Sequence, residues 1–128
     1  MNDVLTALGR VGLSLMFIVL GWGKIAGYAA TQQYMDSAGV PGALLPLTIV
    51  VEVGGGLAIL LGLYTRCVAI ALAVFTLVTA AIFHLPHFAD AAQAVHAWKN
   101  LSIAGGMLVL AAHGAGAYSL DAKWRSKK

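Results

Sequence analysis

A chain of 128 residues with 60% hydrophobic and only 10% charged side chains is too apolar for a soluble domain, in which about a quarter of residues are charged. The formal net charge is +3, but four of the eight Lys and Arg residues lie within positions 123–128, directly behind a hydrophobic segment. We therefore interpret this basic tail as a topology signal that contacts anionic lipid, and we expect no nucleic-acid partner. The single cysteine, Cys67, excludes an intrachain disulfide and a CxxC redox pair.

Four apolar segments are long enough to cross about 30 Å of hydrocarbon, which takes roughly 20 helical residues. The sequence thus predicts an all-α, single-domain four-helix bundle that is integral to the membrane. The expected spans are about 5–26, 44–64, 66–85 and 97–117, followed by a basic tail at 118–128.

The first span contains Arg10 and Lys24, which must snorkel outward or face the bundle interior. A cleaved signal peptide is the alternative, but no small-x-small cleavage site follows cleanly, so we expect a retained span. One face of this span is marked by residues at alternating intervals of four and three positions: Arg10, Ser14, Phe17, Gly21, Lys24 and Tyr28. The mixed stretch 27–43 that follows has room for a short interfacial helix.

The next two spans should form an antiparallel hairpin, because Gly62 to Arg66 leaves only a tight connection between them. Pro46 falls in the first turn of its span, where a missing N–H is harmless. Pro86 ends the third span, because proline cannot continue the helical hydrogen-bond ladder. A short loop at 86–96 then leads to the last span.

Four spans place both ends of the chain on one side of the membrane. Arg10, Arg66 and the four cations of the tail then share that side, whereas Lys24 and Lys99 lie on the other. This distribution satisfies the positive-inside rule, so we expect both termini to be cytoplasmic. Trp22, Trp98 and Trp124 each fall near an expected interface, which is typical of aromatic-belt anchors.

Glu52 is the most informative residue, because it lies about eight residues into its span, roughly 12 Å deep. An ionisable group there costs on the order of 3 kcal/mol, so Glu52 should have a partner or be protonated. We favour a functional role over a purely structural ion pair. Gly54, Gly55 and Gly56 follow, and they either let a neighbouring helix approach closely or leave space for a flat ligand.

Further polar residues gather toward the outer end of the expected bundle. His84 closes a polar line on the third span, and Lys99 and Asn100 enter the membrane at its outer edge. Together with Lys24 they should converge above Glu52, where they could bind a polar head group or relay a proton. The alternative for either lysine alone is snorkelling to lipid phosphates. We assign catalytic proton exchange to Glu52 and His84, and ligand contacts to Arg10, Lys24, Gly55, Lys99 and Asn100.

The four histidines do not predict a metal or haem site. His84 and His87 have a possible ligand spacing, but Pro86 lies between them. A membrane haem needs two histidines at matched depth, whereas His113 lies near the inner end of its span and His84 near the outer end. We therefore expect no metal and no covalent cofactor, and we leave open whether the group of His84, His87 and His96 binds anything.

Taken together, the chain resembles the DoxX family of small four-span bacterial membrane proteins from about residue 7 to residue 116. The resemblance rests on the following residues, in order: Arg10, the run 17–21 with Lys24, Glu52 and the glycines behind it, Gly62 with Thr65 and Arg66, His84, and Lys99-Asn100-Leu101 before Gly105-Gly106. It implies a multi-pass protein of the bacterial inner membrane.

The resemblance also implies a function, since relatives are associated with a terminal quinol oxidase and with thiosulfate:quinone oxidoreductase, and others with oxidative or quinone stress. We therefore expect a quinone-linked redox component, which would be a subunit of an oxidoreductase with a lipophilic quinone as ligand and a redox partner protein or a sulfur oxyanion as electron donor. The alternatives are a small proton-coupled transporter and an assembly or chaperone subunit. A homo-oligomer is compatible with all three.

Overall fold

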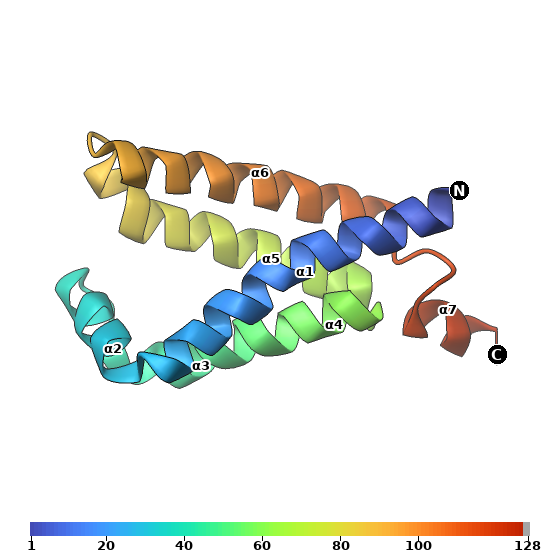
Figure 1. Cartoon of the computed structure of the whole chain (residues 1–128), viewed down its shortest axis with the longest axis horizontal. Helices are drawn as coiled ribbons and strands as arrows, with labels where there is room; N and C mark the ends of the chain where they lie inside the picture. The colour runs from blue at the N-terminus through green and yellow to red at the C-terminus, as the bar shows by residue number, and fades with distance from the viewer. Residues whose placement is uncertain (127–128) are drawn as a thin grey trace.

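The computed structural model describes residues 1–126, and these residues form helices and their connections without any strand. Figure 1 shows four long helical segments that run antiparallel to their sequence neighbours. The segments are α1 (Asn2–Ala26); the series η1 (Gly42–Leu44), α3 (Leu45–Ile49), η2 (Val50–Gly54) and α4 (Gly55–Leu61); the series α5 (Thr65–Thr79), η3 (Ala80–His84) and η4 (Leu85–His87); and α6 (Ala91–His113). The all-α prediction is confirmed.

Three of these segments, Asn2–Ala26, Gly42–Leu61 and Thr65–His87, are long and apolar enough to cross a membrane. The fourth, α6, has 23 residues and packs along α5, but His96, Lys99 and Asn100 make its first half less apolar. Helix α6 begins at Ala91 and not near 97 as expected, because the Asp90 carboxylate caps it by accepting a hydrogen bond from the Ala92 N–H at 2.9 Å. The short helix α2 (Tyr28–Ser37) occupies the stretch where an interfacial helix was predicted.

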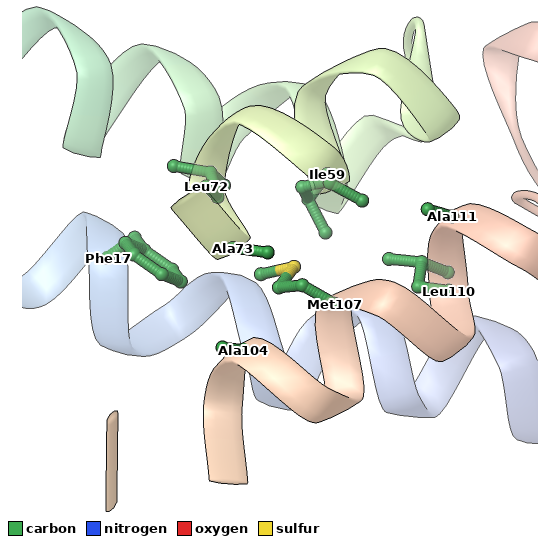
Figure 2. Packing of buried hydrophobic residues seen from close by; sticks show 9 residues of the cluster. Phe17, Ile59, Leu72, Ala73, Ala104, Met107, Leu110 and Ala111 are labelled. Carbon is green, nitrogen blue, oxygen red and sulfur yellow. The ribbon is translucent and has the colours of Figure 1, made fainter. Parts of the chain in front are cut away.

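The helices pack as two pairs, α1 against η2 and α4, and α5 against α6. The buried core where the pairs meet contains Phe17, Ile59, Ala69, Leu72, Ala73, Ala104, Met107, Leu110 and Ala111 (Figure 2). Ile59 and Met107 are fully buried there. Small residues at such contacts let helices approach closely, which matters in lipid because apolar side chains gain little by leaving it. The large side chains of Val19, Val74 and Val109 point outward instead and are more than half exposed.

Two glycines bring α1 against the second span. A Cβ added at Gly56 would lie 3.2 Å from the backbone nitrogen of Ile18, and one added at Gly21 would lie 3.3 Å from the nitrogen of Val53. Neither nitrogen can move without shifting its helix. The close-packing interpretation of the glycine run therefore holds for Gly56.

The C-terminal segment folds back onto the turn between α4 and α5. The carboxylate of Asp121, in α7 (Leu120–Arg125), accepts hydrogen bonds from the Tyr64 N–H at 2.7 Å and the Thr65 N–H at 2.9 Å. The Asp121 N–H in turn donates to the carbonyl of Gly62 at 2.9 Å. Burial alone would raise the pKa of Asp121, but the N–H groups of Thr65 and Tyr64, together with the charge of Arg125, hold that pKa below its usual value.

Arg10 connects three elements at this same end of the bundle. Its buried guanidinium donates to the carbonyls of Ile59 and Leu60, each at 3.2 Å, and to the carbonyl of Tyr118. The first two carbonyls belong to the last turn of α4, where carbonyls lack the usual i+4 donors, and the Ile59 carbonyl also accepts from the Gly62 N–H at 3.2 Å. Arg10 thus caps α4 and attaches α1 to the C-terminal segment.

We predict that Gly56→Ala lowers the free energy of unfolding by about 1–3 kcal/mol, because the new methyl group overpacks the contact with α1. Gly54→Ala is the matched control, since a Cβ there meets nothing within 4 Å. Denaturant titration of both variants in detergent micelles would measure the difference. Equal stabilities for the two variants would contradict the close-packing role.

We predict that Asp121→Ala lowers the stability at pH 7 by about 1 kcal/mol, the usual loss when a cap is removed. Because the folded-state pKa of Asp121 lies below its unfolded value of about 4, this contribution is complete above that value and disappears as the pH falls through the folded pKa. Thermal unfolding of both proteins across this acid range should show the two curves converging. A stability difference that is independent of pH would contradict this account.

Candidate functional site

A cavity of about 490 Å³ lies between the two pairs of helices, toward the end of the bundle where α2 is located. The helix pairs diverge toward this end, whereas they are close together at the other (Figure 1). Most of the wall is apolar and comes from α1, α3, α5 and η3, and it includes Phe17, Phe75 and Phe83. Polar side chains are added from every long segment, so the cavity has an amphiphilic lining.

The ion pair of Lys24 and Glu52 is the central polar feature of the wall. The Lys24 ammonium Nζ lies 2.8 Å from both Oε1 and Oε2 of Glu52. The side chain of Glu52 is only 8% exposed and that of Lys24 is 26% exposed. An ammonium that donates to both carboxylate oxygens stabilises the ionised carboxylate. The expectation that Glu52 has a partner is thus fulfilled by a residue of the first span.

Glu52 and His84 both lie in π-helical turns. Glu52 is the middle residue of η2 (Val50–Gly54), and His84 is the last residue of η3 (Ala80–His84). A π-helical turn is rare, interrupts the α-helical hydrogen-bond ladder and frequently occurs at functional sites. The two residues that the sequence singled out for proton exchange therefore share an unusual backbone environment on opposite walls of the cavity.

A chain of contacts joins η3 to the start of α6. The His84 ring is stacked on the His96 ring with centroids 5.2 Å apart, and its Nδ1 lies 2.7 Å from Oε1 of Gln93. Because Gln93 Oε1 only accepts, Nδ1 of His84 carries the proton, and Nε2 is the nitrogen available to a ligand. The Lys99 ammonium lies 3.2 Å from Nδ1 of His96. An ammonium only donates, so this His96 nitrogen accepts and the ring is neutral in this arrangement.

Asn100 and Thr76 form a buried polar contact deeper in the cavity wall. The Asn100 side-chain amide donates to the backbone carbonyl of Thr76 at 3.4 Å. The Thr76 hydroxyl is buried and has no hydrogen-bond partner among the described residues. Both residues line the cavity, which places this buried polar contact directly behind its wall.

The structure brings together five of the seven residues that the sequence predicted for the site. Glu52, His84, Lys24, Lys99 and Asn100 all line the cavity, whereas Arg10 and Gly55 do not. Arg10 shares the predicted face of α1 but lies at the opposite end of the bundle. A Cβ at Gly55 would lie 2.9 Å from Cδ2 of Leu72, so this glycine makes a packing contact with α5.

Helix α2 contributes residues that the sequence did not indicate. Tyr34 lines the cavity, and its ring is stacked on Phe83 with centroids 5.3 Å apart. Tyr34 and Phe83 are 49 positions apart and neither belongs to a motif, so only the tertiary structure reveals the contact.

Within residues 1–126, no three His, Cys, Asp or Glu side chains converge in a way that would hold a metal ion.

The comparisons with known proteins agree with this architecture. The family model of DoxX matches residues 5–85. The chain is similar to the inner membrane protein YqjF of Escherichia coli K12, with 52% identity over 94% of the chain and 92% of that protein. It is also similar to the inner membrane protein YphA of the same organism, with 39% identity over 94% of the chain and 90% of that protein. No solved structure matches the chain.

These relatives and the three strongly apolar helices make the chain a multi-pass protein of the bacterial inner membrane. The family match extends from α1 to the start of η4 and therefore includes Lys24, Glu52 and His84. The chain belongs to the DoxX family.

Proposed function

We propose that the cavity binds a lipophilic quinone, and that the protein acts as a quinone-linked component of an inner-membrane oxidoreductase. The observation that carries this proposal is the amphiphilic cavity of about 490 Å³ among the membrane-spanning helices. Its volume is within the range of small-molecule sites, roughly 300–1,000 Å³. An apolar wall suits an isoprenoid tail and a flat ring, and the polar groups suit the ring oxygens.

The charge pattern of the cavity indicates where a ring oxygen would bind. Lys24 is neutralised by Glu52, which is the only acidic residue among the described lining residues. Lys99 contacts an imidazole nitrogen and, unlike Lys24, no carboxylate among the described residues. Lys99 is therefore the preferred donor to a quinone carbonyl, and it would also stabilise negative charge that develops on that oxygen.

His84 and Glu52 supply the proton chemistry that this function needs. Reduction of a quinone to a quinol takes up two electrons and two protons. His84 would deliver or receive a proton at Nε2, while Gln93 holds the ring through Nδ1. Glu52 would take up a proton from the aqueous side and pass on the second of the two protons, and Lys24 would stabilise the carboxylate that this transfer leaves behind. The two electrons would come from a partner protein or from a soluble reductant such as a sulfur oxyanion.

We predict that purified wild-type protein retains a lipophilic quinone, and that Lys99→Ala reduces its affinity about tenfold. A hydrogen bond to a charged group contributes about 1.5–3 kcal/mol, which corresponds to this factor or more. Solvent extraction followed by chromatography gives the bound amount, and titration of the apoprotein gives the affinity. Lys123→Ala is the matched control, because it removes a lysine charge outside this cavity. Absence of quinone from wild type, or equal binding by all variants, would contradict the proposal.

The ion pair predicts a coupled loss of stability that is separable from ligand binding. Glu52→Gln and Lys24→Gln should each lower the free energy of unfolding by about 2 kcal/mol, because each leaves a partly buried charge without its partner. The double variant should lose clearly less than the sum. A double-mutant cycle measured in ligand-free detergent would give this coupling. Strictly additive losses would mean that the pair contributes nothing to the fold.

A further inference from the structure

Two adjoining cavities lie at the opposite end of the bundle from the quinone cavity, and neither is used by the proposed function. Their volumes are about 300 and 350 Å³, and both are lined by Arg66, Ala115 and Arg125. Their walls come from the start of α5, the connection after α6 and the helix α7. Two guanidinium groups thus border one continuous region of the surface.

These guanidinium groups keep their positive charge. Lys24–Glu52 is the only direct ion pair among residues 1–126, so neither arginine contacts a carboxylate there, although the charge of Arg125 acts on Asp121 at longer range. Asp121 is the acidic residue that lines this region, and both of its oxygens already accept hydrogen bonds from backbone N–H groups. Two arginines against one carboxylate leave a net positive charge that suits an anion.

Arg66 is held in place by the backbone beneath it. A Cβ added at Gly114 would lie 3.2 Å from Nη2 and 3.4 Å from Nε of Arg66, so the guanidinium rests directly on this glycine. Gly114 has φ +92°, a conformation that other residues rarely adopt. The Arg66 Nη2 also donates to the His113 carbonyl at 3.5 Å, a long contact. The guanidinium is thus oriented before any ligand binds.

Two aromatic side chains place this region at the depth of lipid head groups. The rings of Tyr64 and Trp124 are in edge-to-face contact with centroids 5.9 Å apart, and both residues line the first of the two cavities. Tyr64 is 65% exposed and directly precedes the membrane-spanning segment that begins at Thr65, and Trp124, in α7, is 45% exposed. Exposed Tyr and Trp residues at the ends of spans are typical of the membrane–water interface.

We propose that Arg66 and Arg125 bind the head-group phosphate of an anionic phospholipid. Guanidinium groups bind phosphate oxygens with two parallel hydrogen bonds, and arginine remains charged at any physiological pH. Inorganic phosphate offers the same chemistry, but the aromatic pair and the interfacial depth favour a lipid. The lipid would connect the start of α5 with α7 and reinforce the contact that Asp121 makes between them.

The test measures the affinity of short-chain phosphatidylglycerol for the full chain in neutral detergent. Each of the variants Arg66→Gln and Arg125→Gln should weaken binding about fivefold, the contribution expected of one basic residue near anionic lipid. Lys123→Gln is the matched control, because it removes one charge from α7 without lining either cavity, and it should bind within about twofold of wild type. Short-chain phosphatidylcholine should bind at least tenfold more weakly than phosphatidylglycerol.

Three outcomes would overturn the proposal. Equal affinities for wild type and both arginine variants would remove the site, and a loss in Lys123→Gln as large as in Arg125→Gln would reduce it to unspecific charge attraction. Inorganic phosphate that binds as tightly as phosphatidylglycerol would show a free-anion site without lipid specificity. Arg125 is exposed, so its variant should fold even where Arg66→Gln does not, and unfolding midpoints in phosphatidylcholine verify this for each protein.

Discussion

The ion pair between Lys24 and Glu52 is the interaction on which the arrangement of the bundle around its cavity depends. A carboxylate at this depth is unfavourable unless a positive charge and hydrogen bonds compensate for the lost water. Gly21 makes this compensation possible, because it lies one turn before Lys24 and brings α1 within contact distance of Glu52 and Val53. A side chain at position 21 would push apart the helices that carry the two charges. The glycine contact and the ion pair are therefore one structural unit.

Buried polar groups find their hydrogen-bond partners in different ways at the two ends of the bundle. At one end, Arg10 and Asp121 satisfy backbone carbonyls and N–H groups around the α4–α5 turn, and these hydrogen bonds join α1, α4, α5 and α7. At the other end, Lys24, Glu52, His84 and Lys99 interact mainly with one another or with neighbouring side chains around a cavity. The hydrogen bonds of Arg10 and Asp121 hold the helix pairs together at one end, so that the pairs can diverge at the other end.

The sequence predicted the faces of the helices better than the positions along them. The alternating spacing on α1 correctly placed Arg10, Ser14, Phe17 and Gly21 on the buried face. The spacing could not show that Arg10 and Lys24 lie at opposite ends of the bundle. A periodic pattern identifies the face of a helix on which a residue lies, but not which end of that helix borders a cavity. Glu52 was identifiable because an acidic residue inside an apolar run is costly wherever the chain folds.

Other features of the site depend on tertiary structure and had no local signal. The π-helical turns at Glu52 and His84 follow no sequence motif that distinguishes them from α-helix beforehand. Gln93 reaches His84 from the first turn of α6, and Tyr34 reaches Phe83 from helix α2. Such residues cannot be identified from the sequence by assigning residues to membrane spans alone.

The chemistry of the charged residues separates the two sites that we propose. Arg66 and Arg125 carry planar groups with fixed donors, which suit the several oxygens of a phosphate. Lys99 carries a compact charge that shares its donors with His96, and this suits a single oxygen on a neutral ring. A lipid phosphate in the quinone cavity would have to compete with Glu52 for Lys24 and would be repelled by its carboxylate. If the cavity binds a quinone as we propose, the ion pair that makes Glu52 tolerable in the membrane would also disfavour anionic head groups there.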